Sequence, residues 1–190
     1  MEKHIKLPLT QELAKTLQAG DTIYLTGEVY TSRDAGHKRM CEALERGEAL
    51  PFDPRDATIY YVGPTPARPG QVIGSAGPTT SGRMDAYAPA MMAAGARGMI
   101  GKGARSAEVI AAMAEYGGVY FGAIGGAGAL LARCIKSSEL VAYEDLGAEA
   151  LRRLYVEEMP LVVIIDREGN NLYEAGRAAY LRRNTQNKYL

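Results

Sequence analysis

The chain has 190 residues, of which 47% are hydrophobic and 23% are charged, and these values predict one globular domain with a sizeable core. Its formal net charge is zero, so no overall positive field favours binding to nucleic acid or to an anionic membrane. The sequence contains neither a transmembrane-length apolar run nor an apolar signal-peptide core, and we therefore expect a cytoplasmic protein.

The predicted elements alternate between strands and helices along the chain, which is typical of an α/β fold. Strands are expected at residues 5–7, 22–30, 57–62, 71–74, 99–100, 118–124, 140–143, 161–165 and 172–173. Helices are expected at residues 10–18, 35–46, 84–94, 106–116 and 127–135. The connection at 63–70 contains three prolines and is predicted to be irregular. We expect residues 1–180 to form the domain and residues 181–190 to be a polar tail.

Three of these helices have a residue suited to capping the N-terminus. Thr10, Asp34 and Ser106 each stand where a helical pattern begins, and the side-chain oxygens of these residue types accept bonds from the first free backbone N–H groups. We expect all three to act as caps.

The stretch 75–85 is the first place where the sequence indicates chemistry. It joins a predicted strand to a predicted helix, and backbone N–H groups without helical partners favour a bound anion there. Its candidate ligand groups are the hydroxyls of Thr79, Thr80 and Ser81 and the guanidinium of Arg83. A planar guanidinium matches a carboxylate in geometry. The alternative is an ordinary helix cap beside a solvent-facing arginine.

A second stretch, 30–39, ends a predicted strand and begins a helix. Arg33 lies at the carboxyl end of the strand, where α/β folds place ligands, and His37 lies one helical turn further on. We expect both to reach the same cleft. The alternatives are that Lys38, Arg39 and Arg46 belong to a solvated helix face, and that His37 is structural.

Two glycine-rich segments follow. Lys102 stands between Gly101 and Gly103 at a strand end, where the small neighbours give a ligand access to it, although a surface turn is the alternative. The segment 122–129 is rich in glycine but does not follow the GxGxxG spacing of dinucleotide sites. Helix packing through small residues, or close approach of the backbone to a partner, is the preferred interpretation there.

Arg33, Arg83 and Lys102, at three strand ends, together predict a pocket for a dianionic carboxylate. The sequence has no Ser/His/Asp set, no carboxylate cluster for a metal and no phosphate-binding loop. The two cysteines, Cys41 and Cys134, form no CxxC motif and are too few to complete the ligation of an iron–sulfur cluster. The chain therefore has the features of half an active site.

These motifs resemble a known family. The sequence Gly-Pro-Thr-Thr-Ser-Gly-Arg-Met-Asp at 77–85, with the stretch 30–39 before it and Gly-Lys-Gly at 101–103 after it, is similar to the β subunit of class I iron–sulfur hydro-lyases. These are the two-subunit fumarate hydratases and L(+)-tartrate dehydratases, and the resemblance extends from about residue 7 to residue 180.

The resemblance implies a swivelling β/β/α domain that closes over a 4Fe-4S cluster carried by a partner α subunit, in an assembly of two α and two β subunits. It implies reversible hydration of fumarate to malate, a reaction of central metabolism, with the dehydration of tartrate to oxaloacetate as the alternative. By motif match, the site residues would be Thr79 and Lys102 for catalysis and Arg33, Arg83, Thr80, Gly77 and His37 for substrate binding.

Two other functions remain open from the sequence. An α/β module that only binds organic anions would keep all the cations at the strand ends. A dinucleotide-binding regulatory domain would use the glycines near Gly125. Co-purification with an iron–sulfur partner distinguishes the hydro-lyase from both.

Overall fold

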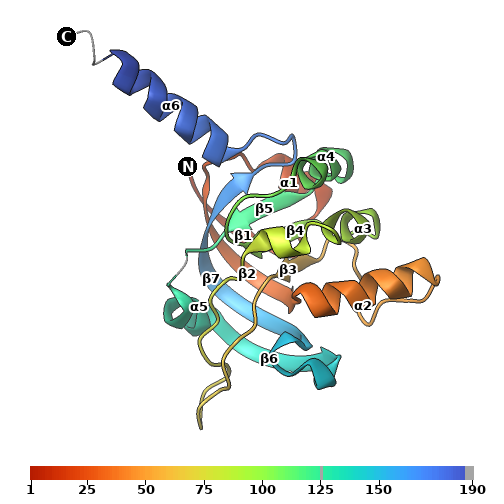
Figure 1. Ribbon diagram of the computed structural model, residues 1–190. Helices are drawn as coiled ribbons and strands as arrows, with labels where there is room; N and C mark the ends of the chain where they lie inside the picture. The colour runs from red at the N-terminus through yellow and green to blue at the C-terminus, as the bar shows by residue number, and fades with distance from the viewer. Residues whose placement is uncertain (125, 187–190) are drawn as a thin grey trace.

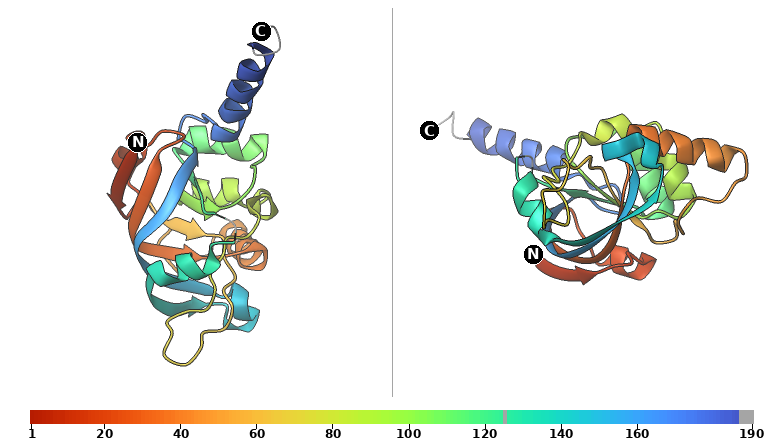
Figure 2. Two further views of the ribbon diagram at one scale, coloured as in Figure 1. Left: turned by 90° about the vertical axis from the view of Figure 1, so that its left-hand side faces the viewer. Right: turned by 90° about the horizontal axis from the view of Figure 1, so that it is seen from below.

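The computed structural model describes residues 1–124 and 126–186 and has a mixed α/β fold (Figure 1). The α/β prediction is therefore confirmed. The alternation of strands and helices in the sequence does not predict that the sheet closes on itself. Its strands curl into a small barrel, which is seen end-on in the right-hand view of Figure 2.

The barrel contains five strands. They are β2 (Thr22–Thr31), β3 (Thr58–Tyr60), β4 (Gly98–Gly101), β5 (Val119–Gly122) and β7 (Leu151–Ile165). The first four are parallel in that order, and β7 pairs antiparallel with both β5 and β2, which closes the ring. Two further strands extend it: β1 (Glu2–Lys6) pairs with β2, and β6 (Ile135–Ala142) pairs with β7.

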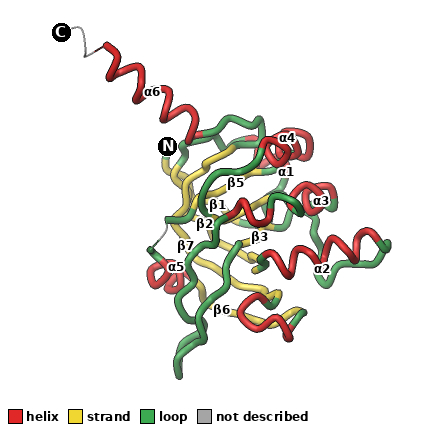
Figure 3. The backbone as a smooth tube through the Cα atoms, viewed as in Figure 1, coloured by secondary structure: helices red, strands yellow, loops and turns green. Residues whose placement is uncertain are grey.

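Helices cover one side of the barrel (Figure 3). Those on this side are α2 (Asp34–Glu45), α3 (Ala88–Ala93) and α4 (Ala107–Tyr116). The others are α1 (Gln11–Lys15), α5 (Gly128–Cys134), α6 (Leu172–Gln186) and the 3₁₀ helices η1 (Ser81–Met84) and η2 (Glu144–Glu149). Helix α6 projects away from the body in every view.

Burial follows the strand patterns of the sequence. Along β2 the buried residues alternate with partly exposed ones, because one face of the strand points into the barrel. The short strands β3, β4 and β5 are buried throughout, as expected for parallel strands with both faces covered. One core cluster includes Leu25, Val29 and Phe121, and a second, which includes Met40 and Met113, packs the helices against the barrel.

Two of the three predicted helix caps are confirmed. Thr10 Oγ1 accepts a bond from Leu13 N at 3.2 Å, and Ser106 Oγ accepts one from Val109 N at 3.3 Å. The predicted Asp34 cap is wrong. Asp34 is the first residue of α2, Arg33 occupies the N-cap position, and no side chain caps this helix, since the Asp34 carboxylate bonds to an arginine instead.

Two strand predictions are wrong, and the first part of one strand was missed. Residues 71–74 are not a strand but part of a long connection whose ends meet at the bridge between Val62 and Pro78. Residues 172–173 begin helix α6. The first part of β7 was not predicted, because its charged residues and Pro160 disguise a strand that has one partly exposed face.

Candidate functional site

The carboxyl ends of β2, β3 and β4 meet at one edge of the barrel, because these strands are parallel neighbours. Arg33 follows β2, and Lys102 follows β4 directly. The connection after β3 returns to the same edge, where Thr79 N donates to the carbonyl of Tyr61 at 2.7 Å. A backbone bridge then joins Thr80 to Lys102. The three stretches singled out in the sequence therefore lie together.

The two arginines of this edge share one carboxylate. Arg83 Nη2 lies 2.7 Å from Asp34 Oδ2, and Arg33 Nε lies 3.8 Å from Asp34 Oδ1. Arg33 also pairs with Glu149 through an Nη2–Oε1 distance of 3.2 Å. Because Asp34 and Arg83 are partly exposed, a pair of this kind contributes only roughly 0.2–1 kcal/mol. The ammonium of Lys102 has no hydrogen-bond or ion-pair partner among the described residues.

Gly77 is held in place by close backbone packing. Ala76 N donates to the carbonyl of Gly128 at 3.0 Å, and a side chain at Gly128 would clash with Ser75 Oγ and come within 3.0 Å of Gly77 N. The predicted close approach of the glycine-rich segment is confirmed at Gly128, while Gly125 lies outside the described residues. This contact fixes the direction from which the chain reaches Thr79 and Thr80. The side chain of Thr79 is half-buried, and that of Thr80 is exposed.

His37 does not line the site surface, contrary to the expectation that it reaches the cleft, because its side chain has no exposed area. Its Nδ1 lies 2.9 Å from both Ser32 Oγ and the carbonyl oxygen of Arg33, and its ring meets Tyr61 edge-on. Burial lowers the pKa of His37 from 6.5 to about 4, so the ring is neutral at pH 7. The structure thus places His37 beneath the loop that carries Arg33.

We expect His37 to make folding stability fall with acidification. Below pH 6.5 the unfolded chain binds a proton that the folded chain, with its pKa near 4, does not bind. The free energy of unfolding should therefore decrease by up to about 1.4 kcal/mol for each pH unit between about pH 6 and pH 4, and this contribution should level off below the folded-state pKa. Urea unfolding between pH 7 and pH 5 measures this slope.

The matched comparison uses the two histidines of the chain. His37→Gln should remove this part of the slope, and His4→Gln, at an exposed ring, should keep it. Equal slopes in wild type and His37→Gln would contradict the assignment.

A buried ion pair lies beneath the site, and sequence reasoning missed it. Arg105 Nε bonds to Asp85 Oδ1 at 2.7 Å, and Asp85 Oδ2 accepts a bond from Ser106 N at 2.6 Å. The Arg105 guanidinium lies 5.4 Å from the ring of Tyr61 and 5.1 Å from that of Tyr120. Burial opposes its charge, but Tyr61 and Asp85 raise its pKa above the ordinary value. The only sequence signal was the position of Asp85 at the end of the stretch 75–85, while Arg105 lies two residues beyond Gly103.

Tyr120 connects the same two motifs. Its hydroxyl donates to the carbonyl of Gly103 at 3.0 Å and lies 2.9 Å from Ser81 Oγ. Ser81 begins η1, which carries Arg83, and Ser81 N donates to the carbonyl of Lys102 at 2.9 Å. The loops that present Arg83 and Lys102 are therefore bonded to each other and to the barrel.

The described residues contain no group of three or more His, Cys, Asp or Glu side chains that could hold a metal ion. Cys41 and Cys134 belong to different core clusters, so the fold does not bring the two thiols together. These side chains do not fit the ligation of an iron–sulfur cluster by this chain. Of the helices described, none combines the length and the apolar character needed to cross a lipid bilayer.

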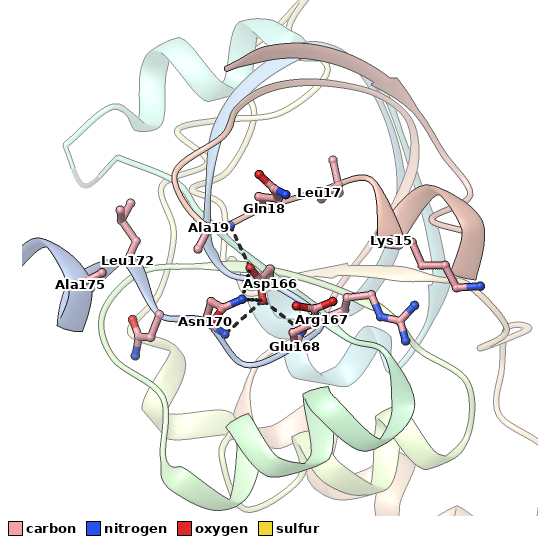
Figure 4. Close-up of a pocket in the computed structure, with 11 residues that line it drawn as sticks. Lys15, Leu17, Gln18, Ala19, Asp166, Arg167, Glu168, Asn170, Leu172 and Ala175 are labelled. Carbon is pink, nitrogen blue, oxygen red and sulfur yellow. Dashed lines mark hydrogen bonds between the residues drawn. The ribbon is translucent and has the colours of Figure 1, made fainter.

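A surface pocket of about 330 Å³ lies beside the start of α6 (Figure 4). None of the residues that line it belongs to these motifs. Its central carboxylate, Asp166, accepts bonds from Ala19 N at 3.2 Å and from the backbone and side chain of Asn170. These bonds hold the turn between β7 and α6 against the connection between α1 and β2. They give Asp166 a structural role.

Comparison with known proteins identifies the family. Residues 1–176 match the family model described as fumarase C-terminus. The aerobic class I fumarate hydratase of Escherichia coli K12 is 39% identical over 171 residues, which cover 88% of this chain and 31% of that protein. The mitochondrial fumarate hydratase 1 of Leishmania major is 41% identical over 166 residues, which cover 86% of this chain and 30% of that protein.

A shorter relative matches over nearly its whole length. The putative L(+)-tartrate dehydratase subunit beta of Methanocaldococcus jannaschii is 38% identical over 172 residues, which cover 87% of this chain and 88% of that subunit. The chain thus spans about a third of the fumarate hydratases that it matches and most of this β subunit. It belongs to the fumarase C-terminus family, and it is homologous to class I fumarate hydratases and to the tartrate dehydratase β subunit.

Proposed function

We propose that this chain is the β subunit of a two-subunit class I fumarate hydratase, which interconverts fumarate and malate. The observation that carries the proposal is the convergence of Arg33, Arg83 and Lys102 with Thr79 at one edge of the barrel. A second candidate is the β subunit of an L(+)-tartrate dehydratase, and the match over 88% of a putative subunit of that kind favours it. Both reactions use a small dicarboxylate and fit the same cations.

In this proposal the partner α subunit carries the 4Fe-4S cluster, and the two chains form a heterotetramer of two α and two β subunits in the cytoplasm. When bound, the cluster supplies a Lewis acid for the hydroxyl group of the substrate. Residues 1–180 act as one swivelling β/β/α domain, and the segment 181–190 that follows begins inside helix α6, which continues to Gln186. Closure of this domain over the partner excludes water from the site.

The chain's own cations bind and orient the substrate. Arg33, Arg83 and Lys102 contact the two carboxylates, and the backbone at Gly77 and the hydroxyl of Thr80 line the same edge. In the dehydration direction a proton leaves the carbon beside one carboxylate, and the electron pair of that C–H bond delocalises toward the carboxylate. Fixed cations stabilise this charge more in the transition state than in the ground state.

Thr79 is the group that we propose to accept the proton, alone or with an α-subunit carboxylate. Its backbone is fixed by the bond to the Tyr61 carbonyl, so the hydroxyl has a defined position at the site. A threonine hydroxyl is a weak base, and neighbouring cations lower the pKa of an oxygen acid. Below this edge His37 stays neutral and supports the Arg33 loop without touching the substrate.

Reconstitution tests the proposal. We expect the purified chain alone to be colourless and inactive, and we expect it to become active when mixed with a cluster-loaded α subunit. Turnover of fumarate against L(+)-tartrate by the pair then distinguishes the two candidates. Stoichiometric iron and sulfide on this chain alone would contradict the division of labour. Binding of dicarboxylates without turnover by the pair would favour a binding module instead.

A further inference from the structure

We infer that Asp34 is an internal stand-in for a substrate carboxylate: it occupies Arg83 in the free chain and releases Arg83 when a dicarboxylate binds. The inference rests on the proposed function, because it assigns Arg83 to the substrate. It adds a specificity-determining residue that itself makes no bond to the ligand.

The contacts of the two arginines differ, and this difference decides which one is released. Among the described residues Arg83 has a single charged partner, Asp34, and its side chain is 50% exposed. Arg33 is only 20% exposed, contacts Asp34 and Glu149, and passes so close to Gly63 that a Cβ there would lie 2.8 Å from Nη1. Arg33 is therefore held in place, while Arg83 is free to exchange one carboxylate for another.

The cluster also contains unsatisfied polar atoms. Arg33 Nε, Asp34 Oδ1 and Glu149 Oε2 are buried and have no hydrogen-bond partner within the part of the chain that the structure describes. Buried polar atoms normally have partners, and those without one favour a ligand or a rearrangement. Movement of Asp34 away from Arg83 would let its carboxylate pair more closely with Arg33 Nε, from which Oδ1 is now 3.8 Å away.

The charges of the cluster balance in the free chain. Arg33 and Arg83 are matched by Asp34 and Glu149, so a dianion meets little net attraction beyond that of Lys102. A ligand carboxylate must compete with Asp34 for the Arg83 fork. Removal of the Asp34 charge should therefore strengthen binding of a dicarboxylate, because Arg83 loses its competing carboxylate. The substitution adds no new contact to the ligand.

The test measures binding of succinate, a saturated four-carbon dicarboxylate, to the full chain by NMR titration of the arginine Nε–H signals. Asp34→Asn keeps the shape and removes the charge, and we expect its dissociation constant to be about two- to fivefold lower than that of wild type, as release of a partly exposed ion pair predicts. Asp34→Glu keeps the charge and should bind close to wild type.

Asp145→Asn is the matched control, because Asp145 pairs at an exposed position with Arg39, an arginine within α2. It should leave succinate binding unchanged. Equal or weaker binding in Asp34→Asn, equal strengthening in Asp145→Asn, or the absence of saturable binding in Asp34→Asn would overturn the inference.

The arginine variants separate this inference from the proposed function. Arg83→Lys and Arg33→Lys should both weaken binding of succinate. If neither does, the carboxylate clamp itself fails. If both do and Asp34→Asn is unchanged, the clamp stands and only the role of Asp34 is rejected.

Discussion

Replacement of Thr79 by valine should reduce turnover by a factor of about 10² to 10⁴ while substrate still binds, since this is the usual contribution of a positioned general base. Valine keeps the volume of threonine and removes only the hydroxyl. The backbone bond from Thr79 N to the Tyr61 carbonyl does not depend on the side chain, so the loop should keep its course. The measurement is hydrogen–deuterium exchange at the substrate carbon, run on the reconstituted pair with an intact cluster.

Thr80→Val is the informative comparison for this experiment. Thr80 is the exposed neighbour of Thr79, and its side chain is assigned to binding, so its loss should raise KM more than it lowers kcat. If Thr79→Val exchanges the substrate hydrogen as fast as wild type, Thr79 is outside the proton path. The stretch 75–85 would then serve to bind carboxylates only.

Replacement of Arg105 by methionine should lower the free energy of unfolding by about 3–5 kcal/mol, the usual cost of breaking a buried ion pair. The Arg105 side chain has no exposed area, and its loss leaves the Asp85 carboxylate, which is 15% exposed, without its cation. The rings of Tyr61 and Tyr120 lose the same neighbour. Urea unfolding at pH 7 measures the loss.

Two further variants control for general effects of removing a charge. Arg39→Met breaks the exposed pair with Asp145 and should cost much less, because water solvates the carboxylate that remains. The double variant Arg105→Met with Asp85→Asn should recover part of the lost stability, because no uncompensated charge is left. Equal losses in Arg105→Met and Arg39→Met would show that the buried pair has no special role.

Sequence patterns predicted the parts of this molecule that depend on local chemistry. The caps at Thr10 and Ser106 require only a few consecutive residues, and both are present. The convergence of Arg33, Thr79 and Lys102 was also predictable, because the carboxyl ends of neighbouring parallel strands share an edge. The glycine-rich segment was correctly read as a close approach, since its spacing does not fit a dinucleotide loop.

The features that the sequence predicted wrongly or missed depend on partners that are distant in the chain. Strand β7 closes the barrel by pairing with β2 and β5, and its charged residues hide a strand that such pairing stabilises. Residues 71–74 have the composition of a strand, but they pair with no strand among the described residues and form part of the connection between β3 and η1. Periodicity cannot report which strands meet, and long-range pairing therefore decided the architecture.

The sequence by itself determined which residues are candidates for a carboxylate site, because motif and residue type are local properties. Only the tertiary structure decided how far their side chains are buried, which of them are charged and which ion pairs they form. It buried His37 and kept it neutral, paired Arg83 with Asp34, and enclosed Arg105 between Tyr61 and Tyr120. Burial and ion pairing depend on which side chains meet in space, and segments as far apart as α2, η1 and η2 meet only after the barrel closes.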